Sequence, residues 1–186
     1  MEDEKIVDLY WDRNEYAIVC TQQKYGAYLL KIAQNILSDI QDSEESVNDT
    51  YMAAWNSMPP NRPKVLATYL GKIVRQISID TLRKKTSKKR GGTEYSLSYD
   101  ELSETITTEV EPLHELEAKR LSETISDFLI SVGWTERNVF IGRYYFFDSI
   151  REVAAYCGIS ESNAKTMLFR LRKELKEYLI REGFEL

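Results

Sequence analysis

Apolar side chains return every three or four residues through most of this 186-residue chain, a spacing that places them on one face of an α-helix. The pattern is clearest in three stretches between residues 25 and 82. Their apolar positions are Tyr25, Tyr28, Leu29, Ile32, Ala33, Ile36 and Leu37, then Val47, Tyr51, Trp55 and Met58, then Leu66, Tyr69, Leu70, Ile73, Ile77 and Leu82. No stretch shows a comparably sustained alternation of apolar and polar residues, the pattern typical of a β-strand. The sequence therefore predicts an all-α fold.

Two segments interrupt the helical pattern. Three of the four prolines stand at positions 59, 60 and 63, so a loop is expected near residues 58–64. From residue 86 to 112 apolar residues are too sparse to form a buried face, while glycine, serine, threonine and acidic residues gather. The sequence predicts two small helical domains, over residues 1–88 and 113–186, joined by a flexible acidic linker over residues 89–112.

The formal net charge of -5 hides a strong alternation of sign along the chain. Residues 2–52 carry eleven acidic against four basic residues, and residues 94–127 carry ten against two. Residues 72–90 carry eight basic residues against Asp80 alone, and residues 137–181 carry nine basic against five acidic residues. Basic runs are typical of surfaces that bind nucleic acid. The two basic segments are therefore candidate nucleic-acid surfaces despite the acidic total.

The second domain carries start and stop signals for three helices. Thr135 is expected to cap the first helix. Ser149 and Glu152 fit the capping box of a short second helix, which Gly158 ends and after which Ser160 caps a third. A short helix, a tight turn and an amphipathic helix form the helix-turn-helix arrangement that reads duplex DNA. The outward face of the third helix holds Ser162, Asn163, Lys165, Thr166, Phe169, Arg170 and Lys173.

Early residues of that face are suited to base edges and its later cations to phosphates. An ordinary helical hairpin with a solvated basic face fits the bare pattern equally well. The helix-turn-helix therefore needs support from the rest of the chain.

Composition argues against catalysis and against a metal or cofactor site. Cys20 and Cys157 are far apart and match neither a disulfide framework nor a metal-ligand spacing. The single histidine, His114, has no second histidine nearby, and no glycine-rich phosphate-binding motif is present. No apolar run approaches the roughly 18 residues of a membrane helix, and the start of the chain is acidic rather than signal-like. We expect a cytoplasmic protein that is not an enzyme, holds no cofactor and does not insert into a membrane.

Three stretches of the chain resemble one protein family. The segment from Asp42 to Trp55, DSEESVNDTYMAAW, is similar to the pattern D-A-E-D-L-V-Q-E-x-F-L-x-A-W, and the segment from Tyr69 to Arg83 is similar to W-L-Y-R-I-A-R-N-x-x-I-D-x-x-R. These patterns are those of bacterial RNA polymerase sigma factors, sigma-70 family, extracytoplasmic-function (ECF) subfamily. Residues 149–172 resemble region 4 of the same family. The resemblance covers nearly everything outside the expected linker.

The resemblance implies a promoter-specificity subunit that binds core RNA polymerase and directs transcription initiation. Residues 1–88 would form region 2, which contacts the -10 promoter element, and residues 113–186 would form region 4, which contacts the -35 element. The implied partners are promoter DNA, the clamp coiled coil of the polymerase beta-prime subunit and the beta flap. An anti-sigma factor stays open as a further partner.

The resemblance also implies roles for individual residues. The residues expected to bind polymerase are Asp42, Glu45, Asn48 and Asp49. The residues expected to contact the -10 region are Asn61, Arg62 and Lys64, in a loop that accepts an unstacked base, and Lys72, Arg75, Gln76, Arg83 and Lys84, on a basic helix face expected to lack carboxylate partners. The seven outward residues of the helix-turn-helix would contact the -35 region.

The chain departs from the family pattern at a few positions. Gln76 stands where the family usually has Asn, Tyr69 where it has Trp, and Met167 where a basic residue is common. Phe147 and Asp148 replace a frequent Gly-Leu pair. We therefore expect promoter preference to differ, while the hydrophobic framework is kept.

Two other functions stay open. One is a free-standing helix-turn-helix regulator that binds duplex operators without polymerase and has no use for the acidic segment 42–49. The other is a metal-dependent helical hydrolase in which Glu45 and Asp49, one turn apart, share a cation. A separate hypothesis is that the acidic segment 94–127 shields the basic surfaces when polymerase is absent. Its alternative is a plain solvated linker.

Overall fold

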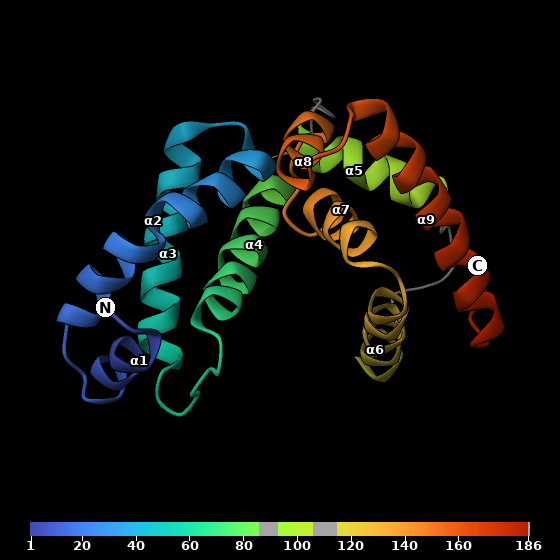
Figure 1. Cartoon of the computed structure of the whole chain (residues 1–186). Helices are drawn as coiled ribbons and strands as arrows, with labels where there is room; N and C mark the ends of the chain where they lie inside the picture. Colours follow the sequence, from blue (N-terminus) through green and yellow to red (C-terminus); the bar gives the residue numbers. More distant parts are fainter. Residues whose placement is uncertain (86–92, 106–114, 186) are drawn as a thin grey trace. The chain divides into compact units, whose positions relative to one another are not determined.

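All regular elements that the structure describes are α-helices, which confirms the predicted all-α fold (Figure 1). The structure is a computed structural model and describes residues 1–85, 93–105 and 115–185. The chain divides into two compact units, Met1–Thr93 and Glu94–Leu186. Each unit is built around its own apolar core, as the interrupted helical period predicts.

The first unit contains α1 (Asp3–Trp11), α2 (Tyr16–Leu37), α3 (Ile40–Ser57) and α4 (Leu66–Lys85). Helices α2, α3 and α4 pack against one another, and α1 packs against α2. The fully buried positions of this core include Ile6, Tyr10, Leu29, Ile36, Ala54, Met58, Leu66, Leu70 and Val74. Each long helix therefore buries the apolar stripe read from the sequence and leaves its other side exposed.

The predicted loop lies between α3 and α4. Helix α3 ends at Ser57, and Met58, which caps it, is fully buried. Pro59, Pro60 and Pro63 follow before α4 begins at Leu66. Because proline lacks a backbone N–H and does not continue a helix, these residues separate the two helices. The two buried ends, Met58 and Leu66, fix the loop to the core.

The second unit contains α5 (Glu94–Ser103), α6 (Glu115–Ser131), α7 (Trp134–Tyr144), α8 (Ile150–Cys157) and α9 (Glu161–Arg181). Helices α7, α8 and α9 pack on one another, α6 packs on α9, and α5 packs on α7. The buried core of this unit is formed by Phe128, Val139, Phe140, Tyr144, Val153, Leu168, Leu171, Leu175 and Leu179.

Most of the predicted helix caps are confirmed. The Ser149 hydroxyl accepts from the Glu152 N–H, and the Glu152 carboxylate accepts from the Ser149 N–H at 2.9 Å. Gly158 has φ 67°, the left-handed conformation that glycine adopts without strain. The Ser160 hydroxyl accepts from the Asn163 N–H at 3.2 Å. These three caps set the short helix, the turn and the long helix of the helix-turn-helix.

The predicted cap at Thr135 is wrong. Helix α7 begins at Trp134, and Gly133 is the residue before it. The Glu136 carboxylate accepts from the Gly133 N–H at 3.0 Å, so an acidic side chain in the first turn satisfies that donor. Because this contact places the cap at Gly133, two residues before the predicted position, Thr135 lies inside the helix.

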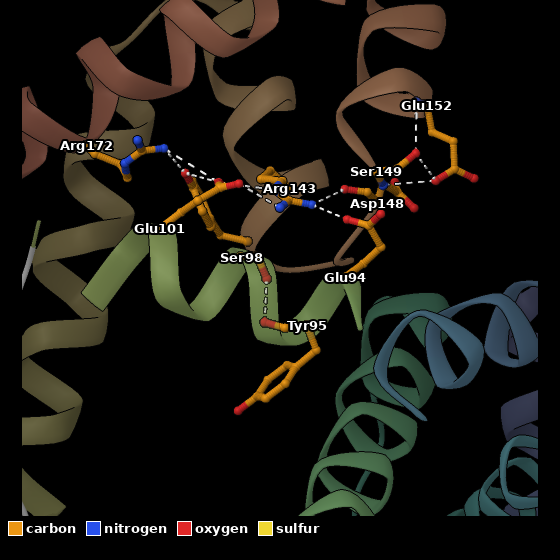
Figure 2. A network of polar contacts seen from close by, with 10 residues as sticks. Glu94, Tyr95, Ser98, Glu101, Arg143, Asp148, Ser149, Glu152 and Arg172 are labelled. Atoms are coloured by element: carbon orange, nitrogen blue, oxygen red, sulfur yellow. Dashed lines mark hydrogen bonds and ion pairs between the residues drawn. The ribbon is translucent and has the colours of Figure 1, made fainter. Parts of the chain in front are cut away.

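The predicted linker over residues 89–112 is wrong in part, because residues 94–103 form helix α5 of the second unit. Its packed side mixes polar and apolar residues: Ser98 is buried, and Glu94 and Glu101 turn toward α7 (Figure 2). Tyr95 packs against Phe147 and Leu102 packs against the core, and so few apolar residues give only a weak helical period in the sequence. The parts of the expected linker at residues 89–92 and 106–112 lie outside the described residues, as does His114.

A buried arginine holds α5 in place. Arg143 of α7 is only 2% exposed. Its guanidinium pairs with Glu94 at 2.6 Å and with Glu101 at 2.7 Å, and it donates to the Asp148 carbonyl at 3.1 Å. Burial alone would lower the pKa of Arg143, but the hydrogen bonds that it donates to the two carboxylates raise it above its usual value. The arginine therefore stays charged inside the unit and ties α5, α7 and the turn before α8 together.

Loss of one carboxylate from this cluster is expected to loosen the second unit. We expect Glu101→Gln to lower the unfolding free energy of this unit by about 1–3 kcal/mol, because a buried cation loses half of its charge compensation. Hydrogen exchange of amides in α7 measures the change locally. Glu104→Gln, at an exposed position just beyond α5, is the matched control and should exchange like the unchanged protein. Equal protection in both variants would contradict a structural role for the cluster.

Candidate polymerase and nucleic-acid interfaces

The four residues predicted on the acidic helix all lie on α3, and three of them face away from the core. Glu45, Asn48 and Asp49 are exposed, while the opposite side of α3 buries Val47 and Thr50. Asp42 differs from the others, because its side chain is only 16% exposed and forms an ion pair with Lys85 at the end of α4. Three of the four predicted residues therefore form an accessible polar face.

The ion pair with Asp42 also changes the pKa of Lys85. The hydrogen bond from Lys85 to Asp42 raises the pKa of the Lys85 ammonium above its usual value. Because the pair joins the first turn of α3 to the last turn of α4, it links the acidic face to the basic helix within one unit.

Met52 extends the acidic face and was missed by the sequence reasoning. It is 52% exposed and lies one turn after Asn48 on α3. The available signal was its position outside the apolar stripe of Val47, Tyr51 and Trp55. An exposed methionine beside polar residues gives this face an adaptable apolar element.

The predicted basic face of α4 is present but is not free of acid. Lys72, Gln76, Arg83 and Lys84 are exposed, and Arg75 is half-buried. Asp80 accepts from the Gln76 amide at 3.0 Å and lies 3.8 Å from the Arg83 guanidinium. The expectation of no carboxylate partners is therefore wrong, because residues three or four apart on a helix are neighbours.

The loop between α3 and α4 exposes the three residues predicted in it, Asn61, Arg62 and Lys64. Two of them contact α1. The Trp11 indole N–H donates to the Asn61 carbonyl at 3.2 Å, and the Arg62 guanidinium lies over the Trp11 ring, 5.5 Å from its centre. Arg62 also forms an ion pair with Asp8. Sequence reasoning missed Asp8 and Trp11, because about fifty residues separate them from the loop.

All seven residues predicted on the helix-turn-helix are exposed along the first half of α9. Phe169 is 65% exposed, an unusual position for a large aromatic ring. The Thr166 hydroxyl donates to the Ser162 carbonyl at 3.0 Å. Arg170 pairs with Glu136 of α7 and lies 3.4 Å from Glu174 of α9. The face is accessible, and one of its cations is held by carboxylates of its own unit.

The inner side of α9 is fixed by both apolar and polar contacts. Leu168 and Leu171 are buried against the core, and Arg172 donates to the Tyr144 hydroxyl at 2.5 Å. Arg172 also lies 3.6 Å from Glu101, which joins α9 to the Arg143 cluster (Figure 2). Burial raises the pKa of Tyr144 to about 12, although Arg172 acts in the opposite direction. The orientation of the exposed face therefore depends on this cluster.

Close approach of α7 and α8 depends on Gly142. A Cβ atom at this position would lie 1.7 Å from the Tyr156 hydroxyl and 3.2 Å from a Val153 methyl group. A larger residue at this position would have to displace the half-exposed Tyr156 ring where the two helices meet. The turn between α7 and α8 contains Phe147, whose φ of 57° is rare for a residue with a side chain.

These features define a helical protein of two units, each with an outward-facing charged helix face. The second unit also contains a helix-turn-helix. Comparison with protein families finds two matches. Sigma-70 region 2 matches residues 22–88, and Sigma-70, region 4 matches residues 133–175. Both models describe one family and together span more than half of the chain. The chain belongs to the sigma-70 family of sigma factors, whose domains bind core RNA polymerase and promoter DNA and direct transcription initiation.

The family matches cover most of α2, all of α3 and α4, and α7, α8 and most of α9. Helices α1, α5 and α6 lie outside them. No curated protein matches the chain. Among the described helices, none has the length and apolar character needed to cross a membrane.

The raised pKa of Tyr144 makes stability depend on alkaline pH. The folded unit keeps a proton up to about pH 12 that an unfolded tyrosine releases near pH 10. The contribution is therefore complete below pH 10 and is lost as pH rises toward 12, by at most about 3 kcal/mol. We expect Tyr144→Phe to flatten this decline, and the exposed Tyr99→Phe to leave it unchanged. Urea unfolding at several pH values, followed by NMR signals of the buried α9 leucines, measures it.

Proposed function

We propose that this sigma-70 family member is a promoter-specificity subunit of the ECF type that recognises the -10 and -35 elements. The observation that carries the proposal is the outward position of the acidic face of α3 and of the cation-bearing face of α9. Both faces lie inside the matched regions. The polymerase supplies the chemistry, in the bacterial cytoplasm, and this chain selects where transcription starts.

The acidic face of α3 is the proposed contact with polymerase. Glu45, Asn48 and Asp49 are exposed together and suit a basic partner surface, the clamp coiled coil of the beta-prime subunit. Met52 adds apolar area to the same contact. The beta flap is proposed as the partner of the second unit, and an anti-sigma factor stays open as a regulator.

The basic face of α4 and the neighbouring loop are the proposed -10 contacts. Lys72, Arg83 and Lys84 are placed to follow the phosphate backbone, and Gln76 to reach base edges. Arg75 is half-buried, so its contribution would come from the edge of this face. Asn61, Arg62 and Lys64 would receive the base that leaves the stack when the duplex opens.

The exposed half of α9 is the proposed -35 contact. Ser162, Asn163 and Thr166 lie near the start of the helix, where side chains reach base edges in the major groove. Lys165 and Lys173 are suited to the flanking phosphates. Phe169 is available for apolar contact with a thymine methyl group. Arg170 would exchange Glu136 for a phosphate when DNA binds.

The runner-up function is a free-standing operator-binding regulator. The helix-turn-helix alone is compatible with it, but the exposed acidic face of α3 has no role in that function. The metal-dependent hydrolase has no observation in its favour. In the part of the chain that the structure describes, no group of three or more potential metal ligands comes together.

The shielding hypothesis for the acidic segment 94–127 changes in the light of α5. Glu94 and Glu101 are engaged with Arg143 inside the second unit. These two carboxylates therefore do not cover the exposed cations of α9. A variant that lacks residues 94–111 would also lose both carboxylate partners of Arg143. A change in its DNA affinity would therefore not measure shielding alone.

Charge reversal on α3 tests the polymerase contact. We expect Asp49→Lys to reduce run-off transcription from a matching promoter at least about tenfold, because the new cation would repel a basic partner surface. Asp127→Lys, an equal reversal at an exposed position of α6, is the control and should transcribe normally. Transcription by Asp49→Lys at the control level would favour the operator-binding regulator.

Removal of single cations from α9 tests the -35 contact. We expect Lys165→Ala and Lys173→Ala each to weaken binding to promoter duplex and to reduce the salt dependence by roughly one phosphate contact. Titrations at several salt concentrations measure both quantities. Lys119→Ala, an exposed lysine of α6, should change neither. An unchanged salt slope in both α9 variants would remove this face from the proposed interface.

A further inference from the structure

Helix α1 lies outside the segment matched by region 2, yet it contacts the loop proposed to receive an unstacked base. Three contacts connect them. Trp11 donates to the Asn61 carbonyl, Arg62 lies over the Trp11 ring, and Asp8 forms an ion pair with Arg62. The exposed surface around the loop is therefore made by two segments that are distant in sequence.

The residues in these contacts are accessible. Trp11 is 39% exposed, and the side chains of Asp8 and Arg62 are each 53% exposed. Unpaired bases bind proteins by stacking on aromatic rings and on arginine guanidinium groups. An indole ring with a guanidinium held over it, beside a loop with polar groups, has the chemistry needed to hold such a base.

These contacts are not what holds α1 in the fold. Ile6 and Tyr10 are fully buried, and the Tyr10 hydroxyl forms a buried hydrogen bond of 2.9 Å with Thr21. After the end of α1, Arg13 donates to the Trp55 carbonyl at 2.7 Å. An ion pair as exposed as Asp8 with Arg62 adds little to stability. Asp8 and Trp11 can therefore be changed without unfolding the first unit.

We propose that Trp11 and Arg62 form the surface on which an unstacked base of the opened promoter rests, and that Asp8 is a positioning residue that holds Arg62 until DNA phosphate replaces it. This inference rests on the proposed function and extends it to α1. In the free protein the Asp8 carboxylate neutralises Arg62 and keeps the guanidinium over the indole. On binding, a phosphate oxygen takes the place of the carboxylate, so Asp8 weakens capture of DNA that does not present both base and phosphate.

The two residues should act in opposite directions. We expect Trp11→Ala to reduce affinity for a single-stranded -10 oligonucleotide about tenfold, because a stacking surface is lost. Trp11→Phe keeps an aromatic ring and should retain most of the affinity. We expect Asp8→Asn to raise the affinity about two- to fivefold at low salt, with the gain shrinking as salt rises, because phosphate no longer competes with a carboxylate.

The experiment uses the full chain bound to core polymerase, with a promoter that carries a fluorescent base analogue in the -10 element. Open-complex formation and oligonucleotide affinity are measured for each variant. Trp134→Phe and Asp12→Asn, at an exposed tryptophan of α7 and an exposed aspartate beside α1, are the matched controls. Thermal unfolding of each variant checks that the first unit is intact.

Opposite changes in Trp11→Ala and Asp8→Asn, with unchanged controls, would support the inference, since a purely structural role would lower affinity in both. Equal affinity in all variants, or a loss in both, would overturn it while leaving the proposed function standing if the unchanged protein still opens the promoter. Failure of the unchanged protein to direct core polymerase to any promoter of a genomic library would overturn the proposed function itself.

Discussion

One-sided burial of amphipathic helices is the constraint on which both units depend. Helix α3 buries Val47 and Thr50, so Glu45 and Asp49 must face outward, and α9 buries Leu168 and Leu171, so Lys165 and Lys173 must do the same. The helical spacing that places apolar residues in the core therefore also places the charged residues on separate outer surfaces. A chain with an acidic total charge can in this way carry local faces of either sign, one suited to a basic protein surface and the others to DNA.

Several cations proposed to meet DNA are held by carboxylates of their own unit. Arg62 pairs with Asp8, Arg83 lies near Asp80, and Arg170 pairs with Glu136. Each pair is exposed enough for water and salt to weaken it, and such pairs contribute about 0–1 kcal/mol. A phosphate can therefore replace the carboxylate at little cost. The pairs orient the side chains in the free protein and disfavour contacts that offer charge without the right geometry.

Local chemistry was predictable from the sequence, and distant contacts were not. The cap at Ser149, the turn at Gly158 and the outward faces of α3 and α9 depend on residues within a few positions of one another. The contact of Trp11 with the loop and the ion pair of Glu94 with Arg143, which holds α5 on α7, each join segments about fifty residues apart. Helix α5 was also hidden by its composition, because two carboxylates and a serine share its packed side with Tyr95 and Leu102. Two apolar residues on a packed face leave only a weak hydrophobic period in the sequence.

Helix α5 packs against the turn before α8, where the chain departs from the family pattern that the resemblance implies. Phe147 and Asp148 stand where the resemblance to ECF sigma factors implies a Gly-Leu pair, and Phe147 has the positive φ that favours glycine. Its ring is buried and packs edge-on against Tyr95 of α5 at 5.0 Å, which offsets the backbone cost. The Asp148 carbonyl accepts from Arg143, which in turn holds Glu94 and Glu101. Since Phe147 packs against Tyr95 of α5 and the Asp148 carbonyl accepts from Arg143, α5 is part of the unit that positions α9, and that unit begins at Glu94 rather than at residue 113.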